Sequence, residues 1–274
     1  MTLTIGRISY LNTVPFFHHL DLAGMPARIV DGVPAELNAS LAAGRIDLSP
    51  SSSFEYARSW RDYRLLPGLS ISSRGAVCSV LLFSRQPLEA VAGSEIVLTG
   101  ESATSVNLLQ VLLREFCGAG EVVFRVAGDA TEGVVAAGGS ALLIGDRALH
   151  LAGSLPAGTQ VYDLGELWYR FTGLPFVFAL WIVRERAFAE WPEAIREFRR
   201  RLDRSMARAF AALDDVAAAV APQTSLSAAE LVRYWRDSMS YELTDDHLAG
   251  LRRFFSLCCK YGLLDEEPQL RFTD

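Results

Sequence analysis

The chain has 274 residues, of which half are hydrophobic and 21% are charged, with a formal net charge of −6. A chain of this length can bury roughly 70 to 75% of its unfolded surface, so a full core needs neither metals nor disulfides. The composition excludes a disordered chain. The acidic balance, without a run of basic and aromatic residues, argues against a nucleic-acid partner.

Sequence features that direct export or hold a metal are missing from the chain. The N-terminus lacks a basic stretch followed by an apolar one, and no apolar run reaches the roughly 18 residues that span a membrane. We therefore expect a cytoplasmic protein with no membrane partner. The four cysteines and four histidines show neither zinc-site spacing nor a His-x-x-x-His pair, so the sequence predicts no metal.

One pattern recurs four times along the chain: a short apolar run, a polar cluster and a helical pattern. The apolar runs and their clusters are 3–8 with 9–13, 46–48 with 49–53, 95–98 with 100–102, and 141–144 with 145–146. Strands that alternate with helices predict an α/β fold with a largely parallel sheet. Two further apolar runs, 80–83 and 176–183, fit buried strands and lie where the chain could cross between lobes.

The residues after Arg184 are almost all helical in pattern. Pro192 is predicted to open a helix with an apolar stripe on one side. Ser227 and Glu230 have the spacing of a capping box. Thr244 is predicted to cap a last helix that ends near Gly262.

The polar clusters indicate where a ligand would bind. In open α/β sheets ligands bind beyond the carboxyl ends of the strands, where helix N-termini direct free amides outward. The clusters are rich in hydroxyls and largely uncharged, which favours carboxylates held by amides and hydroxyls. Ser and Thr are also the commonest helix caps, so the capping interpretation stays open. The signatures G-x-S-x-G, the P-loop and G-x-G-x-x-G are absent, which argues against acyl transfer and nucleotide chemistry.

Five stretches together resemble one known family. They are SYLNTVPF at 9–16, SSFEYA at 52–57, SVLLFS at 79–84, LLIGD at 142–146 and TGLPFVFA at 172–179. In this order they resemble the chorismate dehydratase family, which shares the fold of type 2 periplasmic solute-binding proteins. The resemblance runs from about residue 5 to about residue 183.

The resemblance implies a two-lobed α/β fold with two crossover strands and a ligand cleft between the lobes. Mapped onto this chain, lobe one comprises residues 1–83 plus 182–274, and lobe two comprises residues 84–181. The family is a carbon–oxygen lyase that removes water from chorismate, a small dicarboxylate, to give 3-[(1-carboxyvinyl)oxy]benzoate. This reaction opens the futalosine route to menaquinone and uses no cofactor.

The resemblance also assigns roles to individual residues. The implied catalytic residues are Asn12 and Ser79, with Glu55 as a candidate base after the substrate's own enolpyruvyl carboxylate; the implied substrate-binding residues are Ser52, Ser53, Thr104, Ser105, Gly145 and Asp146. The chain departs from some members at Ala103, where they have Arg, and at Ser51, where an apolar residue is common. Asn12 could instead be a helix cap, Ser79 the start of a strand, and Glu55 a carboxylate favoured by a helix N-terminus.

Two alternatives to this function remain open from the sequence. One is the 1,4-dihydroxy-6-naphthoate synthase of the same pathway, which has similar lobes. The other is a binding module that closes on a small carboxylate without catalysis.

Overall fold

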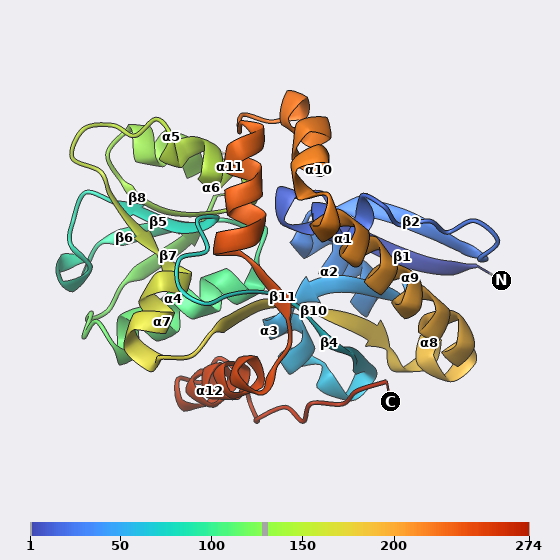
Figure 1. Cartoon of the computed structure of the whole chain (residues 1–274). Coiled ribbons are helices and arrows are strands. Elements are labelled where there is room, and N and C mark those ends of the chain that lie inside the picture. The colour runs from blue at the N-terminus through green and yellow to red at the C-terminus, as the bar shows by residue number, and fades with distance from the viewer. Residues whose placement is uncertain (1, 128–130, 274) are drawn as a thin grey trace. The chain divides into compact units, whose positions relative to one another are not determined.

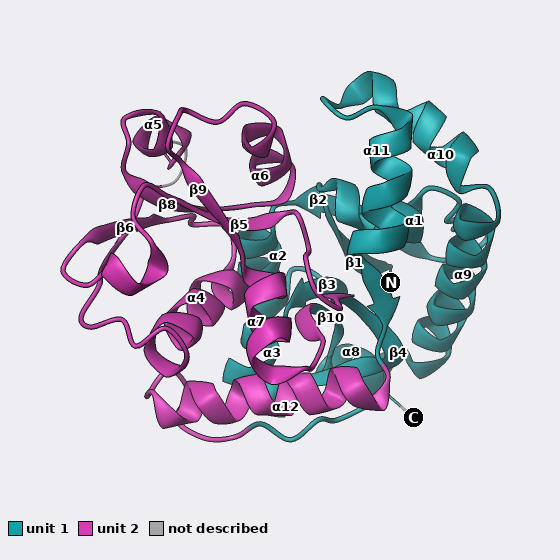
Figure 2. Ribbon diagram, turned by 60° about the vertical axis from the view of Figure 1, so that its left-hand side comes forward, with its two compact units in different colours: residues 1–71, 179–243, 268–274 teal, residues 72–178, 244–267 magenta. Residues whose placement is uncertain are grey.

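A computed structural model describes residues 2–127 and 131–273 (Figure 1). The chain divides into two compact units, coloured separately in Figure 2. Unit 1 comprises residues 1–71, 179–243 and 268–274, and unit 2 comprises residues 72–178 and 244–267. Two long strands, β4 (Tyr63–Ser73) and β10 (Phe176–Arg184), contain the first two boundaries.

These units differ from the lobes expected from the sequence, 1–83 plus 182–274 and 84–181. The first boundary falls in β4 and not at the run Val80–Phe83. The sequence pattern did not indicate β4, because Arg64 and Pro67 interrupt its apolar residues. The run at Val80–Phe83 belongs to β5 (Val80–Ser84), which is buried along its whole length inside the unit 2 sheet. The last helix, α12 (Asp245–Lys260), belongs to unit 2.

The unit 1 sheet has the strand order β11-β4-β10-β3-β1-β2. Its remaining strands are β1 (Leu3–Ile8), β2 (Ala27–Gly32), β3 (Leu48–Ser52) and β11 (Ser240–Glu242). β1 runs parallel to β2 and β3, and β10 runs antiparallel to β3. Gly6 of β1 has no space for a side chain, since a Cβ there would lie 2.5 Å from the Oγ of Ser49.

Helices pack around this sheet within unit 1. They are η1 (Leu11–Thr13), α1 (Val14–Phe17), α2 (Pro34–Ala42), α3 (Ser53–Arg58), α8 (Glu185–Glu190), α9 (Pro192–Ala211), α10 (Leu213–Val220) and α11 (Ala228–Arg233). Pro192 opens α9 as predicted, and Ile195, Phe198 and Leu202 form its buried stripe. The predicted capping box at Ser227 is confirmed at the start of α11.

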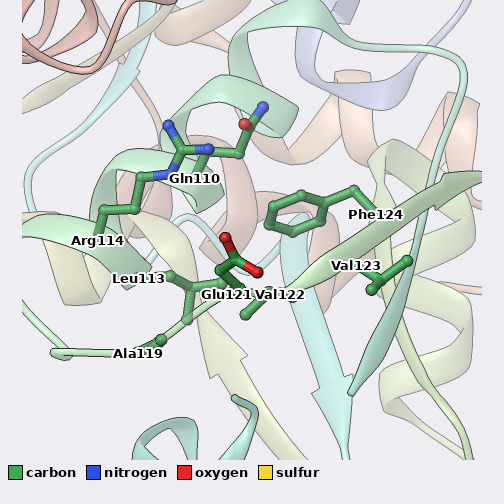
Figure 3. A pocket seen from close by; sticks show the side chains of 9 residues that line it. Gln110, Leu113, Arg114, Ala119, Glu121, Val122, Val123 and Phe124 are labelled. Atoms are coloured by element: carbon green, nitrogen blue, oxygen red, sulfur yellow. The ribbon is translucent and has the colours of Figure 1, made fainter. Parts of the chain in front are cut away.

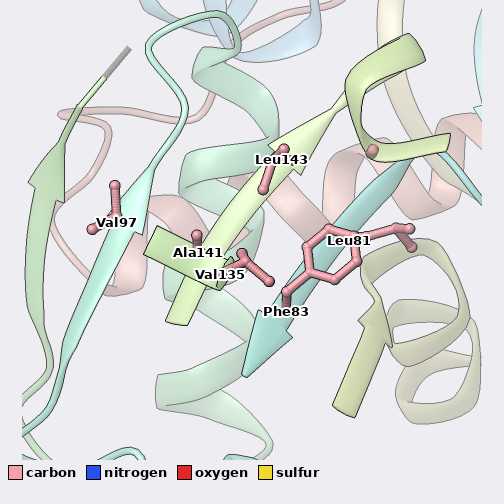
Figure 4. Close-up of a cluster of buried hydrophobic side chains, with 7 residues drawn as sticks. Leu81, Phe83, Val97, Val135, Ala141 and Leu143 are labelled. Carbon is pink, nitrogen blue, oxygen red and sulfur yellow. The ribbon is translucent and has the colours of Figure 1, made fainter. Parts of the chain in front are cut away.

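The unit 2 sheet has the order β7-β6-β8-β5-β9. Its other strands are β6 (Glu95–Leu98), β7 (Val123–Val126), β8 (Ser140–Ile144) and β9 (Gln160–Asp163). β6 is parallel to β7 and β8, whereas β5 is antiparallel to β8 and β9, so the sheet is mixed. Figure 4 shows one face of this sheet, where Phe83, Ala141 and Leu143 gather with Val135 in a buried apolar cluster.

Unit 2 contains α4 (Ala103–Glu115), α5 (Thr131–Ala136), α6 (Gly145–Ala152), α7 (Leu164–Thr172) and the C-terminal α12. α12 docks by aromatic contacts, with Phe254 set edge-on to Trp168 and Phe176. Gly250 allows a closer approach, because a Cβ at this position would lie only 2.1 Å from the carbonyl oxygen of Pro175. The close packing of α12 on the turn before β10 thus depends on a glycine within the helix.

Candidate functional site

In unit 1, two predicted site segments leave the sheet at the same edge. β1 and β3 run parallel, so the turn that follows β1 and the end of β3 lie at their shared carboxyl edge. Asn12 comes from the first segment, and Ser52 and Ser53 come from the second. β3 begins at Leu48, two residues later than predicted, and extends through the predicted polar cluster to Ser52. Ser52 is therefore the last residue of the strand and not part of a turn.

The turn after β1 is fixed by hydrogen bonds to its backbone carbonyls. The Thr13 hydroxyl donates to the carbonyl of Ile8 at 2.7 Å. The indole of Trp235 donates to the carbonyl of Leu11 at 2.8 Å, and the hydroxyl of Tyr241 donates to that of Asn12 at 2.9 Å. Trp235 and Tyr241 lie more than 220 residues further along the chain, so the C-terminal part of unit 1 holds this turn in place.

The side chain of Asn12 does not cap a helix. The cap positions of η1 and α1 are Tyr10 and Thr13, and neither cap is made by a side chain. The Oδ1 atom of Asn12 is buried, and it has no hydrogen-bond partner among the described residues. A buried carbonyl oxygen without a partner is uncommon and costs about 1 to 3 kcal/mol. The backbone carbonyl of Asn12 thus has a structural partner, whereas its side-chain carbonyl has none.

Glu55 makes contacts of a different kind. Its carboxylate is buried, accepts a hydrogen bond from the hydroxyl of Tyr63 at 3.1 Å and pairs with Arg58. Burial raises the pKa of Glu55, and the charge of Arg58 and the two hydrogen bonds oppose that rise. Tyr63 begins β4 and lines a hollow with Arg184, whereas Ser52 pairs with Ala179 at the other end of β10.

Ala179 and Arg184 are five residues apart on one strand, which is roughly 17 Å. Tyr63, the partner of Glu55, thus starts β4 beside the hollow that Arg184 lines. These contacts favour a structural role for Glu55 over that of a base at the substrate edge.

In unit 2, three predicted segments meet at one edge of the sheet. β6 and β8 are parallel and end there, and β5 begins there because it is antiparallel to β8, with Val80 opposite Ile144. The N–H of Gly145 donates to the carbonyl of Ser79 at 2.7 Å. Gly145 has a φ of +61°, a left-handed conformation that favours glycine.

The start of α4 supplies hydroxyls at the same edge. The Oγ of Ser102 accepts a hydrogen bond from the N–H of Ser105 at 3.1 Å and caps the helix. Thr104 and Ser105 are buried in the first turn of this 13-residue helix. A helix N-terminus of this length carries about half a positive charge, which favours a carboxylate or phosphate.

Asp146 follows Gly145 in the first turn of α6, where an acidic side chain suits the helix dipole. Beside it, Arg147 pairs with Glu132 and lies 3.6 Å from Glu101, which precedes the cap of α4. Arg147 therefore links the turns before α4 and α6. The sequence patterns did not single out Arg147, because its partners lie 15 and 46 positions away.

A surface hollow of about 500 Å³ in unit 2 lies away from these turns (Figure 3). Gln110 and Arg114 of α4 line one side of it, and Phe124 of β7 lines another. Val123 pairs with Glu95 at the beginning of β6, so the hollow lies toward the opposite edge of the sheet from Ser79 and Gly145. The hollow is therefore separate from the predicted site.

Within residues 2–127 and 131–273, no cluster of three or more His, Cys, Asp or Glu side chains is arranged to hold a metal ion. No helix in the same ranges is long and apolar enough to cross a membrane.

Comparison with known proteins places the chain in a family. Residues 3–260 match a family model described as menaquinone biosynthesis. The chain is 36% identical over 270 residues to the chorismate dehydratase of Thermus thermophilus, a match that covers 91% of this chain and 93% of the relative. The chain belongs to the chorismate dehydratase family. It is also 31% identical over 180 residues to the Campylobacter jejuni chorismate dehydratase, covering 64% of each chain.

Solved structures support the fold. An Archaeoglobus fulgidus protein matches with a TM-score of 0.76 at 17% identity, covering 96% of this chain and 98% of that one. The alkanesulfonate-binding protein SsuA of Xanthomonas axonopodis pv. citri, solved with MOPS bound, matches with a TM-score of 0.71 at 17% identity, covering 97% and 94%. The expected periplasmic-binding-protein-like fold is confirmed.

Proposed function

We propose that this protein is a chorismate dehydratase, a hydro-lyase that removes water from chorismate to give 3-[(1-carboxyvinyl)oxy]benzoate. This reaction is the entry to menaquinone biosynthesis by the futalosine route. The 36% identity to the Thermus thermophilus enzyme over nearly the whole chain carries this proposal. The described turns support it, because both units offer amides and hydroxyls at a sheet edge. Such groups suit a small dicarboxylate.

The turns described above supply the substrate-binding residues in this proposal. Asn12 and Ser79 face the ring, while Ser52 and Ser53 bind one carboxylate. Thr104 and Ser105, with the amides at the start of α4, bind the other. Gly145 and Asp146 form the turn beside Ser79. The buried Oδ1 of Asn12 supports its part, since a hydrogen-bond donor on the substrate would satisfy it.

The reaction proceeds as a stepwise elimination. The proton on the ring carbon that bears the enolpyruvyl ether is removed, and the electron pair left behind is delocalised toward the ring carboxylate. The ring hydroxyl then departs with its bonding pair, takes up the proton and leaves as water, and the ring becomes aromatic. Donors at the start of α4 stabilise the charge that develops on the ring carboxylate, a contribution that is often the largest in catalysis.

The proposed base is the enolpyruvyl carboxylate of the substrate itself. Glu55 remains the second candidate, and its burial against Tyr63 and Arg58 weighs against it. Both candidates would remove the same proton. Turnover by a Glu55 variant distinguishes them, because only the loss of a protein base would lower kcat.

Incubation of the purified protein with chorismate tests the function. We expect an aromatic product lighter than chorismate by one water, identified by mass spectrometry and ultraviolet absorbance. Chorismate that is bound but returned unchanged would indicate a carboxylate-binding module and contradict the proposal.

A further inference from the structure

One carboxylate in unit 2 does more than cap a helix. Asp163 is the N-cap of α7, and its Oδ1 accepts hydrogen bonds from the N–H groups of Gly165 at 2.9 Å and Glu166 at 3.1 Å. It also accepts from the N–H of Val77 at 3.1 Å through Oδ1 and from that of Cys78 at 2.6 Å through Oδ2. The first two contacts are an ordinary cap, whereas the second two reach a segment 85 residues earlier.

The segment that Asp163 holds has a backbone conformation in need of support. Cys78 has a φ of +60° and is the one non-glycine residue with positive φ in the described part of the chain. This conformation is strained for an L-residue and persists only where the surrounding structure holds it. The hydrogen bond from the Cys78 N–H to Asp163 is the shortest of the four and is therefore suited to that purpose.

The packing around the start of α7 fixes the same segment. A Cβ on Gly165 would lie 2.5 Å from the Oγ of Ser73 and 2.7 Å from the carbonyl oxygen of Gly75. The Ser73 hydroxyl also donates to the carbonyl of Gly75 at 2.9 Å. The first turn of α7 thus lies directly against residues 73–75, and Gly165 leaves room there for the Ser73 hydroxyl.

The turn determines where the next residue lies. Ser79 follows Cys78 directly, and its carbonyl accepts the hydrogen bond from the Gly145 N–H. A rotation at Cys78 would therefore displace both Ser79 and the turn at Gly145, since the two are joined at 2.7 Å.

We propose that Asp163 is a positioning residue of the dehydratase site, which holds the left-handed turn at Cys78 and so sets Ser79 and Gly145 at the substrate edge. This inference rests on the proposed function, because it takes Ser79 as a substrate-facing residue. Asp163 acts through the backbone and does not itself contact substrate.

The variant Asp163→Asn tests the role of the second carboxylate oxygen. An amide keeps one acceptor oxygen for the cap but places an NH₂ group against the N–H of Cys78, or the reverse. We expect the ratio kcat/KM to fall by about 10-fold or more. We also expect faster hydrogen exchange at the Gly145 amide, a readout that does not depend on activity.

A second substitution distinguishes positioning from simple loss of a cap. Glycine adopts a positive φ without strain, so Cys78→Gly in the Asp163→Asn background should recover at least about a third of the lost kcat/KM on a logarithmic scale. Ser227→Ala, which removes a cap from α11 in unit 1, serves as the matched control and should leave kcat/KM unchanged. If Asp163→Asn does not fold, Cys78→Val strains the same turn with a β-branched side chain and should lower kcat/KM in the same way.

The proposal is overturned if Asp163→Asn, or Cys78→Val in its place, retains the wild-type kcat/KM and the wild-type exchange rate at Gly145. It is also overturned if Cys78→Gly recovers nothing. A wild-type protein without dehydratase activity would refute the proposed function instead, and the exchange rate at Gly145 would still decide whether Asp163 holds the turn.

Discussion

At the scale of single residues, the backbone of Asn12 has a structural contact, whereas its side-chain oxygen is left for a ligand. Its carbonyl is bound by Tyr241, while the Oδ1 of its side chain is buried without a partner among the described residues. A group that costs stability and contributes no contact is typical of a site prepared for a ligand.

Replacement of Asn12 by Ala should therefore reduce activity without harming the fold. The change removes an unpaired polar atom, so we expect the free energy of unfolding to stay within about 0.5 kcal/mol of wild type or to rise. We expect kcat/KM for chorismate to fall by about 10²-fold or more, from the loss of one oriented contact. Urea denaturation and steady-state kinetics measure the two effects, and a stable variant with wild-type turnover would remove Asn12 from the site.

In contrast to Asn12, replacement of Glu55 should leave turnover almost unchanged. If the substrate supplies the base, Glu55→Gln keeps kcat within about 3-fold of wild type, because Gln still accepts the hydrogen bond from Tyr63. A loss of about 10²-fold in kcat with binding retained would instead make Glu55 the general base.

The raised pKa of Glu55 predicts a pH dependence with a definite sign. The folded protein holds the Glu55 proton more tightly than the unfolded chain does, so this contribution to stability is fully present below the ordinary pKa of 4.5. It is lost as the pH rises through the folded pKa. The stability of wild type minus that of Glu55→Gln should therefore fall as the pH is raised above 4.5, and a difference that grew with pH would mean that Arg58 and Tyr63 outweigh the cost of burial.

At the scale of elements, the close packing of α12 depends on Gly250, which has no Cβ. Gly250→Ala would place a methyl group 2.1 Å from the carbonyl oxygen of Pro175 and force the helix away from the turn before β10. Overpacking of this kind costs about 1 to 3 kcal/mol. Gly133 of α5 is the matched control, since no described residue lies within 4 Å of its Cβ position and Ala there should be neutral or stabilising.

Thermal melting of the two glycine variants compares them directly. We expect Gly250→Ala to melt at a lower temperature than wild type and Gly133→Ala to melt at the same or a higher temperature. Equal melting of both variants would show that α12 can shift at no cost.

The C-terminal segment of unit 1 is held by a backbone bridge between Leu65 and Phe272 and by the buried hydroxyl of Tyr56. The Tyr56 hydroxyl donates to the carbonyl of Gln269 at 2.7 Å and accepts from the N–H of Arg271 at 2.8 Å. Burial raises the pKa of Tyr56 to about 12, so this hydroxyl keeps its proton at ordinary pH.

Tyr56→Phe leaves both backbone groups without this partner and should cost about 1 to 3 kcal/mol. We expect proteolysis after residue 267 to be faster than in wild type, because the segment loses one of the contacts that hold it. An unchanged rate of cleavage would indicate that the bridge between Leu65 and Phe272 holds the segment without Tyr56.

At the scale of the whole molecule, the parts that could be predicted from sequence are those fixed by local pattern. Apolar runs bounded by polar residues predicted β1, β6 and β8, and Pro192 predicted the start of α9. β4 could not be recognised as the crossing strand, because Arg64 and Pro67 interrupt its apolar pattern. α12 could not be assigned to unit 2, since its place depends on contacts with Trp168 and Phe176 far along the chain.

Parts of the candidate site could likewise be predicted from the sequence, and other parts could not. Parallel strands bring their carboxyl ends to one edge, which places Asn12 near Ser52. Ser79 lies beside Gly145 for another reason, because β5 begins where the antiparallel strand β8 ends. Asp163 could not be found, because its importance lies in hydrogen bonds to residues 85 positions away. Glu55 lies within the stretch SSFEYA and stays the second candidate base, although its contacts with Tyr63 and Arg58 favour a structural role.

The most direct test of the account is the crystal structure of the protein in complex with the dehydration product of chorismate. We predict that the product molecule lies within hydrogen-bond distance, about 3.5 Å, of the side-chain amide of Asn12. A product molecule bound away from Asn12 would contradict the account.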